Sequence, residues 1–273
     1  MKYSIPERDP AKCLYIYTLP KAGTYLLASL CEDYGISNSG CHIGFTGYLD
    51  TMAHPPEINR HRPSATRTPQ QYIKTFKQCA GRLAFGHLSP SFLPPGVFCA
   101  TQVIAAYRDP FEVLISEYND FRFIRRDVKF CSEQAEPDDS LAFGLYLQRQ
   151  GPVIRDIMIE MGRYLDCFSQ PIYAQKYYHS VPLLINFNRL REGEYLQWLN
   201  HLFGRFLPAN DKTFEEALHV TYAKPTKTKS EGYSFEIDAL WSPANQAMIK
   251  QLRLKRLHRH LMAQEQAIQA SLR

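Results

Sequence analysis

The stretch that decides the fold of this chain is Tyr15 to Leu27, which reads YIYTLPKAGTYLL. An apolar run leads into a Pro-Lys-Ala-Gly-Thr turn, and a second apolar run follows the turn. This order predicts a strand, an anion-binding loop and a helix. A turn of this kind aims backbone N–H groups and the positive end of a helix dipole at one point, and Lys21 adds a full charge there. The stretch therefore predicts a binding site for a phosphate or sulfate group.

The turn differs from the phosphate loop of ATP and GTP enzymes, G-x-x-x-x-G-K-[ST], because its lysine precedes the glycine and the threonine. It resembles instead the P-K-S-G-T-T loop of the sulfotransferases, which holds the 5′-phosphosulfate of 3′-phosphoadenosine-5′-phosphosulfate (PAPS). Ala22 stands where that family usually has serine, and Tyr25 replaces the second threonine. An ordinary strand-to-helix turn with an exposed lysine is the alternative. The resemblance implies that five loop residues bind PAPS: Lys21, Ala22, Gly23, Thr24 and Tyr25.

A second motif lies in Gln102 to Phe121, QVIAAYRDPFEVLISEYNDF. A short apolar run precedes Arg108, and Pro110 suits the first turn of a following helix because its φ is already helical. The segment resembles the R-x-P-x-x-x-x-x-S sequence of the sulfotransferases, in which the arginine and the serine bind the 3′-phosphate. The resemblance implies that role for Arg108 and for Ser116, about two turns into the helix. The alternative is that Arg108 caps a sheet edge and Ser116 is an ordinary surface serine of the helix.

A third segment, Leu83 to Pro94, reads LAFGHLSPSFLP. It resembles the T-H-L-P-x-x-L-L-P segment of the cytosolic-type sulfotransferases, in which the histidine is the catalytic base. The resemblance implies this role for His87, and an imidazole with the ordinary pKa of about 6.5 suits proton transfer near neutral pH. A structural or solvated histidine is the alternative. His42, in SGCHIGF, is a weaker candidate base because its surroundings match nothing in the family.

Two later segments resemble sulfotransferase segments at fewer positions. Val181 to Leu190, VPLLINFNRL, resembles a late strand of the family that normally ends in a Tyr-Glu pair near the adenine. A Phe-Asn pair replaces it here, so Phe187 either packs on the purine face or is an ordinary buried strand residue. The segment 227–233, KTKSEGY, stands where the family has R-K-G-x-x-G-D-W around the 3′-phosphate. We expect Lys227 and Lys229 to make a looser contact, because an ammonium lacks arginine's fork; a solvated basic loop is the alternative.

The pattern of apolar residues predicts an α/β fold. Apolar runs alternate with helical patterns, which indicates a parallel β-sheet flanked by helices on both faces, in the P-loop-NTPase-like arrangement that the sulfotransferase resemblance implies. Nothing in 273 residues with 45% hydrophobic content forces a second domain, so residues 1–273 are expected to form a single domain. Ligands of such sheets bind beyond the carboxyl ends of the strands. The four runs are Cys13 to Thr18, Leu83 to His87, Gln102 to Tyr107 and Pro182 to Phe187, and the candidate residues at their ends are Lys21, His87, Arg108 and Phe187.

Composition and charge indicate which partners, which cysteine chemistry and which location to expect. The formal charge of +5 is modest and does not demand nucleic acid as a partner. Seven cysteines without a C-x-x-C pair favour reduced thiols over a disulfide framework. The polar start MKYSIPERDPAK and the absence of an apolar run of about 20 residues predict a cytoplasmic protein without a transmembrane segment.

Three further segments of the sequence are polar or basic. A C-terminal helix is predicted to begin at Ser242-Pro243, with its basic stretch KQLRLKRLHRH forming a solvated face opposite an apolar one. Segment 57–70, EINRHRPSATRTPQ, reads as a loop that either borders the acceptor pocket or lies plainly on the surface. Segment 132–140 is a second polar insertion, with no chemistry assigned.

Together these resemblances imply a PAPS-dependent sulfotransferase, which moves a sulfuryl group from PAPS to an acceptor hydroxyl or amine and releases adenosine 3′,5′-bisphosphate (PAP). In this interpretation His87 is the general base, Lys21 stabilises the leaving phosphate, and no metal is needed. The acceptor would be a small molecule, a glycan or a peptide; its identity and the oligomeric state, a dimer included, stay open. Two alternatives remain: a PAPS- or PAP-binding protein of the same fold without activity, and a nucleotide kinase-like phosphotransferase.

Overall fold

The computed structural model spans residues 1–273 and describes residues 11–44, 49–51, 69–92, 101–124, 138–166, 182–195, 198–199, 216, 219, 221 and 232–271. Lys227 and Lys229 lie outside the described residues, as do most of segments 57–70 and 132–140. Within the described ranges, no helix has both the length and the apolar character needed to span a membrane.

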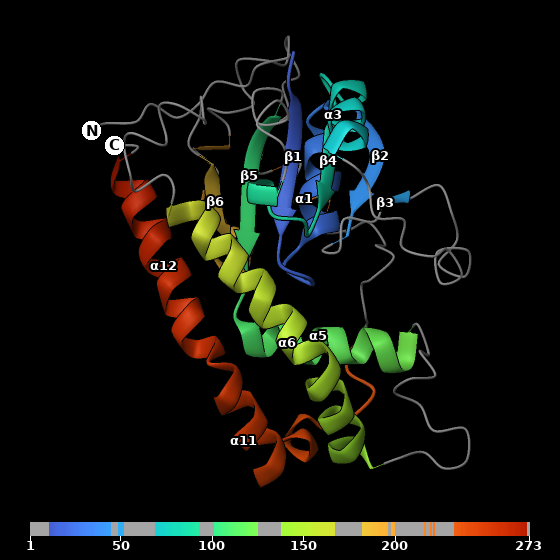
Figure 1. Cartoon of the computed structure of the whole chain (residues 1–273), viewed down its shortest axis with the longest axis vertical. Coiled ribbons are helices and arrows are strands. Elements are labelled where there is room, and N and C mark those ends of the chain that lie inside the picture. Colours follow the sequence, from blue (N-terminus) through green and yellow to red (C-terminus); the bar gives the residue numbers. More distant parts are fainter. Residues whose placement is uncertain are drawn as a thin grey trace.

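The centre of the molecule is a six-stranded sheet in the order β3-β2-β4-β1-β5-β6 (Figure 1). Five strands run parallel, and the short edge strand β3 pairs antiparallel with β2. All four predicted strands are present near their predicted bounds, so the predicted parallel sheet is confirmed. The strands are β1 (Cys13–Thr18), β2 (Asn38–Ile43), β3 (Leu49–Thr51), β4 (Leu83–Gly86), β5 (Thr101–Tyr107) and β6 (Leu183–Asn186).

Strand β2 is the one parallel strand that the sequence did not predict, because NSGCHI has no apolar run. Its partner β4 holds it in place: His42 pairs with Phe85 in the parallel register, and the His87 N–H donates to the carbonyl of Ile43 at 2.8 Å. The two backbones approach so closely at Gly86 that a Cβ there would lie 2.0 Å from the Ile43 oxygen. Tertiary pairing thus makes a strand from a segment with little strand propensity.

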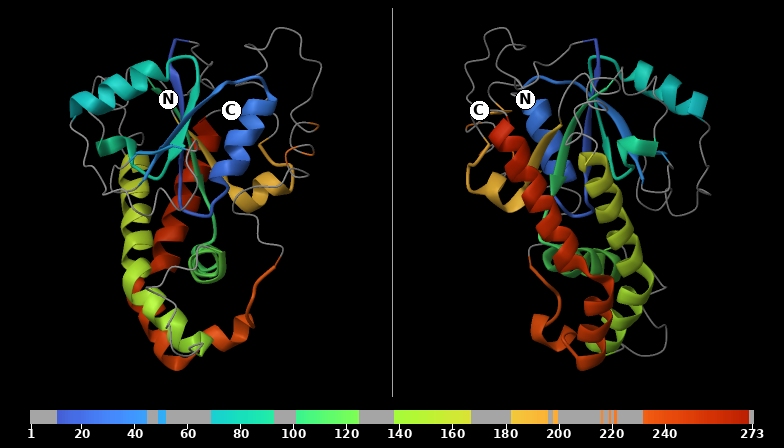
Figure 2. Two further views of the ribbon diagram at one scale, coloured as in Figure 1. Left: turned by 90° about the vertical axis from the view of Figure 1, so that its right-hand side faces the viewer. Right: turned by 60° about the vertical axis from the view of Figure 1, so that its left-hand side comes forward.

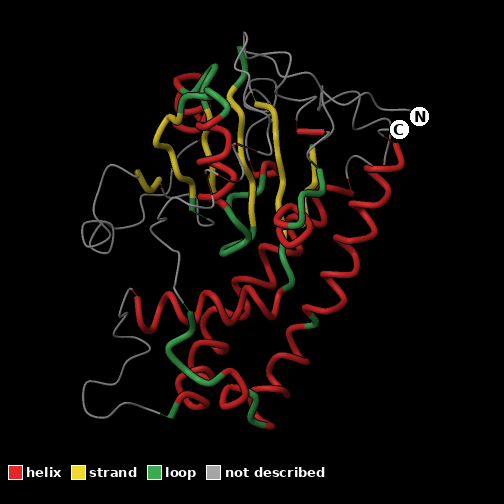
Figure 3. The backbone as a smooth tube through the Cα atoms, turned by 180° about the vertical axis from the view of Figure 1, so that it is seen from behind, coloured by secondary structure: helices red, strands yellow, loops and turns green. Residues whose placement is uncertain are grey.

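Helices cover both faces of the sheet, and a second group lies beyond the carboxyl ends of its strands (Figures 1 and 2). Viewed from behind, the long α6 and the C-terminal pair α11 and α12 extend away from the sheet (Figure 3). The helices are α1 (Thr24–Asp33), α3 (Pro69–Gln78), α5 (Pro110–Asn119), α6 (Asp139–Asp166), α8 (Phe187–Arg191), α11 (Pro243–Leu252) and α12 (Leu254–Ser271). Two short 3₁₀ segments, Pro90–Phe92 and Ile237–Leu240, and a π-turn, Asp120–Ile124, join them.

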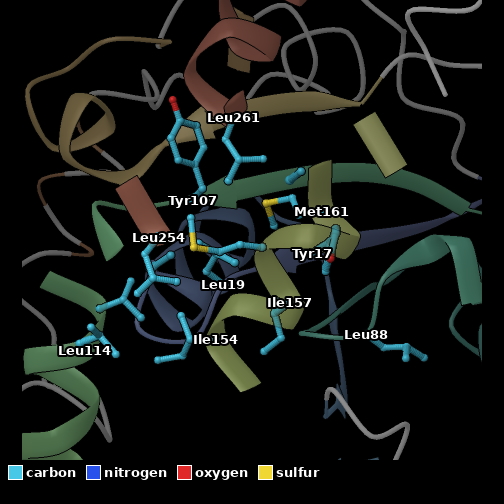
Figure 4. Close-up of a cluster of buried hydrophobic side chains, with 14 of the residues drawn as sticks. Tyr17, Leu19, Leu88, Tyr107, Leu114, Ile154, Ile157, Met161, Leu254 and Leu261 are labelled. Atoms are coloured by element: carbon cyan, nitrogen blue, oxygen red, sulfur yellow. The ribbon is translucent and has the colours of Figure 1, made fainter. Parts of the chain in front are cut away.

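The sheet divides the core into two layers. Strand β1 is buried throughout, and its side chains alternate: Tyr15 and Tyr17 face one layer, whereas Leu14 and Ile16 face the other. The first layer also holds side chains from α6 and α12, which Figure 4 shows converging on Tyr17 and Tyr107. Each fully buried leucine or isoleucine stabilises the fold by roughly 1.5 to 3 kcal/mol relative to an exposed one. This two-sided burial explains why a parallel strand reads as a continuous apolar run.

The C-terminal region begins as predicted but forms two helices rather than one. The Ser242 hydroxyl accepts from the Asn245 N–H at 3.3 Å, and proline occupies the first turn of α11. Helix α11 ends at Leu252, and Arg253, whose φ of 56° is left-handed, separates it from α12. Leu252 and Leu261 are buried in the core layer shared with α6, while most basic side chains of the stretch are exposed. The predicted solvated basic face is therefore confirmed, except at the partly buried His258.

Candidate active site

The predicted anion loop connects β1 to α1 through two left-handed residues, Lys21 with φ 57° and Gly23 with φ 85°. The Ala22 N–H closes the turn by donating to the Leu19 carbonyl at 3.2 Å. Gly23 is the N-cap of α1, and no side chain caps the first turn of that helix. The helix thus presents backbone N–H groups and its positive dipole end next to Lys21, which is the arrangement that binds an anion.

Lys21 forms an ion pair that the sequence did not reveal. Its Nζ lies 3.7 Å from Oδ1 of Asp120, and the two side chains are 11% and 2% exposed. Asp120 begins the π-turn that follows α5. The anion loop therefore contacts the end of the segment Gln102 to Phe121. A buried carboxylate needs a compensating charge, and Lys21 supplies one at the mouth of the loop. No local pattern could have identified Asp120, because the pair joins residues about a hundred positions apart in the chain.

Arg108 directly follows β5 and also reaches the loop. Its Nη1 donates to the Lys21 carbonyl at 3.3 Å, and its Nε and Nη2 bind one oxygen of Glu112 at 2.7 and 2.6 Å. The other Glu112 oxygen accepts from the Asn188 side chain at 2.9 Å. Asp109 meanwhile caps α5 by accepting from the Phe111 N–H at 2.8 Å, which confirms the predicted helix start at Pro110. The guanidinium is thereby held in a defined orientation at the sheet edge.

Phe187, which directly follows β6, covers the loop. It is the first residue of α8 rather than a strand residue, because Asn186 caps that helix by accepting from the N–H of Asn188 at 3.0 Å. Its ring lies against Gly23, where a Cβ would approach a ring carbon to 2.3 Å, and the Arg108 guanidinium sits 5.2 Å from the ring centroid. Only glycine at position 23 permits both the φ and this contact. The purine contact predicted for Phe187 stays a prediction.

His87 follows β4 directly, and its ring is tied to the end of β1. Its Nδ1 lies 2.9 Å from the Thr18 carbonyl and 3.4 Å from the Thr18 hydroxyl. Because a carbonyl can only accept, Nδ1 carries the hydrogen and Nε2 is the basic nitrogen. The next residue is anchored as well: the Tyr15 hydroxyl donates to the Leu88 carbonyl at 2.8 Å, and burial raises the pKa of Tyr15 well above its usual value, which keeps the donor protonated.

His42, the weaker candidate base, proves to be a neighbour of His87. The two rings meet edge to face with centroids 5.2 Å apart. Tyr25, from the first turn of α1, lies 6.0 Å from the His42 ring and 5.7 Å from that of Phe85. Tyr25 and Phe85 thus form an aromatic cluster with His42, and His42 is the member of that cluster that contacts His87.

Ser116 belongs to the helix that Arg108 precedes. It lies within α5, partly buried, and its carbonyl accepts from the Asp120 N–H. Its role toward a 3′-phosphate stays a prediction, as do those of Lys227 and Lys229, which lie outside the described residues.

Clustered metal ligands and reactive thiols are two further features that a functional site could contain. In the part of the chain that the structure describes, no three His, Cys, Asp or Glu side chains are grouped so as to hold a metal ion. The four cysteines of those ranges, Cys13, Cys31, Cys41 and Cys79, are buried free thiols.

Comparison with known proteins gives matches in fold only. No protein-family model matches the chain, and no curated protein matches it in sequence. Among solved structures it is similar to mouse sulfotransferase SULT7A1 complexed with PAP, with 13% identity and a TM-score of 0.48 over 97% of this chain and 90% of that one. It is also similar to retinol dehydratase complexed with retinol and PAP, with 10% identity and a TM-score of 0.47 over 95% of this chain and 82% of that one.

A third similar structure is retinol dehydratase in complex with androsterone and inactive cofactor PAP, with 12% identity and a TM-score of 0.43 over 95% of this chain and 82% of that one. Sulfotransferase structures with PAP bound are thus among the solved structures that this chain resembles. These similarities concern the fold alone, and the roles of individual residues stay predictions.

Proposed function

We propose that this chain is a sulfotransferase, which binds PAPS and transfers its sulfuryl group to an acceptor hydroxyl or amine. The observation that carries the proposal is the convergence of four residues at one edge of the sheet. Each of them lies just beyond the carboxyl end of a different strand: Lys21 after β1, His87 after β4, Arg108 after β5 and Phe187 after β6. A parallel sheet places ligands at that edge, and two cations, an uncapped helix start and a candidate base suit an anionic donor there.

The residues present fit the phosphates of PAPS. The uncapped first turn of α1 offers N–H donors to the 5′-phosphosulfate, next to the Lys21 charge. Arg108 has five N–H donors, of which three are used in contacts among the described residues, so two remain for a 3′-phosphate. Glu112 orients this arginine but also adds a negative charge beside it, so we expect the affinity for a second phosphate to be moderate.

The chemistry follows from the positions of Lys21 and His87. PAPS supplies the sulfuryl group, whose sulfur forms a bond to the acceptor oxygen as its bond to the bridging phosphate oxygen breaks. Nε2 of His87 takes the acceptor proton, and the resulting imidazolium is stabilised by the Thr18 carbonyl at Nδ1. The electron pair of the broken bond stays on the phosphate oxygen, where Lys21 neutralises the developing charge. By analogy with phosphoryl transfer, positioning and charge stabilisation supply most of the acceleration.

Two other functions fit parts of the same site. A PAP-binding protein without activity would retain Arg108 and the loop, and the Ala22 and Tyr25 replacements favour it. A nucleotide kinase-like enzyme would need a lysine after the loop glycine, and the residue there is Thr24.

Calorimetric titration with PAP, AMP and ATP, followed by turnover of PAPS with phenols, sterols, sugars and peptides, distinguishes the three functions. We expect PAP to bind about 10-fold or more tighter than AMP, because a charge-assisted contact contributes roughly 1.5 to 3 kcal/mol, and at least one acceptor to be sulfated. Equal affinity for PAP and AMP would contradict the nucleotide assignment. PAP binding without turnover of any acceptor would favour the inactive binding protein, and preference for ATP would favour the kinase.

A further inference from the structure

A short line of hydrogen bonds joins the anion loop to the candidate base. The hydroxyl of Thr24, at the start of α1, lies 2.5 Å from the hydroxyl of Thr18, which in turn lies 3.4 Å from Nδ1 of His87. The side chains of Thr18 and Thr24 are buried, with the two residues 0% and 4% exposed. Buried hydroxyls are normally hydrogen-bonded, and each of these two hydroxyls has the other as a partner.

Thr18 is held rigidly between the two elements that it connects. It is the last residue of β1 and pairs with Ala106 of β5 in the parallel register. Its carbonyl accepts from His87 at 2.9 Å, so both the main chain and the side chain of Thr18 face the same imidazole nitrogen. A change at Thr24 can therefore reach His87 through one residue.

The direction of these hydrogen bonds depends on what the loop holds. Each threonine hydroxyl has a single hydrogen to donate. When Thr24 donates its hydrogen to an anion at the loop, Thr18 must donate to Thr24, and the Thr18 oxygen is then left to accept from the N–H of His87. Without the anion, Thr24 can donate to Thr18 instead. One lone pair of the Thr18 oxygen is then used by Thr24, and the hydroxyl is no longer held in the orientation that accepts from the N–H of His87.

We propose that Thr18 is a positioning residue that couples occupancy of the anion loop to the proton-accepting state of His87. This inference rests on the proposed function. The Thr18 carbonyl favours the hydrogen on Nδ1 at all times, and the Thr18 hydroxyl reinforces that tautomer only when Thr24 is turned to a bound anion. His87 is then most basic at Nε2 when the donor nucleotide is in place. The base is thus activated together with the group whose transfer it assists.

The test uses Thr18→Val, which removes the hydroxyl but keeps the carbonyl and the shape, and Thr18→Ser, which restores the hydroxyl. We expect Thr18→Val to lower kcat about 10-fold and to move the acidic limb of the kcat profile to lower pH by roughly half to one unit, because the imidazolium loses an acceptor. PAP affinity should change less than about threefold, since in this proposal Thr24, and not Thr18, donates to the anion. Thr18→Ser should recover most of kcat and the original profile.

A matched control is Thr101→Val, which removes a buried threonine hydroxyl at the opposite end of the sheet, where Thr101 pairs with Cys13. This variant should leave the pH profile unchanged, so a shift in Thr18→Val cannot come from loss of a buried hydroxyl alone. An unchanged profile and kcat in Thr18→Val would overturn the coupling while leaving PAP binding and sulfuryl transfer intact. Absence of PAP binding to the wild-type chain would overturn the proposed function together with the coupling.

The tautomer of His87 tests the idea without any change at Thr18, in case Thr18→Val fails to fold. Imidazole ¹⁵N chemical shifts of the wild-type chain, assigned with His87→Gln, should report a hydrogen on Nδ1, and addition of PAP should strengthen that signature. A hydrogen on Nε2 in the PAP-bound chain would overturn the proposal, as would an imidazole signal that does not respond to PAP although calorimetry shows PAP to be bound.

Discussion

The buried ion pair of Lys21 and Asp120 makes removal of Lys21 an informative perturbation, because it affects stability and turnover by separate routes. Lys21→Ala leaves the carboxylate of Asp120, which is only 2% exposed, without the ammonium 3.7 Å away. Removing one partner of a buried pair costs about 3 to 5 kcal/mol, and the long separation places this pair near the lower value. For a chain of this size, we expect a decrease in Tm of roughly 6 to 10 °C by calorimetry.

The effect of Lys21→Ala on turnover should be larger than its effect on nucleotide binding. Lys21 acts mainly on charge that develops on the leaving oxygen, and loss of one such electrostatic contact typically lowers kcat about 100- to 1,000-fold. PAP affinity should fall less than about 10-fold, because the loop amides and Arg108 remain. Arg108→Ala should do the reverse and weaken PAP by about 10- to 100-fold with a smaller loss of kcat, since the 3′-phosphate is remote from the sulfur.

A double variant separates the two effects of Lys21. In Lys21→Ala combined with Asp120→Asn, both charges are absent, so most of the lost Tm should return while kcat stays low. Arg108→Lys should recover only part of the PAP affinity, because an ammonium cannot reproduce the guanidinium fork. The distinct roles assigned to Lys21 and Arg108 would be refuted if their alanine variants had the same kcat and PAP affinity, or if the double variant regained wild-type turnover.

Three further predictions concern other parts of the structure. His87→Ala should reduce kcat about 100- to 10,000-fold with PAP affinity nearly unchanged; wild-type turnover would move the role of base elsewhere, with His42 the first candidate. Gly23→Ala should destabilise the fold and weaken PAP, measured by urea unfolding and calorimetry, because its φ is 85° and the new Cβ would meet the Phe187 ring at 2.3 Å. Burial lowers the pKa of His258 below 6.5, against the opposing effect of nearby carboxylates such as Asp109, so the unfolded chain binds a proton more readily than the folded one. The free energy of unfolding should therefore fall as pH drops below about 6.5, and urea titrations at pH 5.5 and 7.5 should show a smaller difference for His258→Gln.

Local features were predictable from the sequence because their causes lie within a few residues. Strands β1, β4, β5 and β6 read as apolar runs since both of their faces are buried. The starts of α5 and α11 carry an aspartate or serine cap followed by proline. The loop between β1 and α1 combines a lysine and a glycine, which adopt left-handed conformations. These determinants predict the order of the elements and the edge at which a ligand would bind.

The contacts that give the candidate site its chemistry were decided by tertiary structure alone. Asp120 pairs with Lys21, Asn188 donates to the carboxylate that binds Arg108, and His87 donates to the Thr18 carbonyl. Each of these contacts joins residues far apart in the chain, and the sequence around Asp120 or Thr18 has nothing unusual. The pairing of β2 with β4 likewise brings His42 beside His87, although the sequence of β2 has little strand propensity. Sequence patterns record short-range periodicity and capping, whereas these pairs depend on how distant backbones pack, which no local pattern encodes.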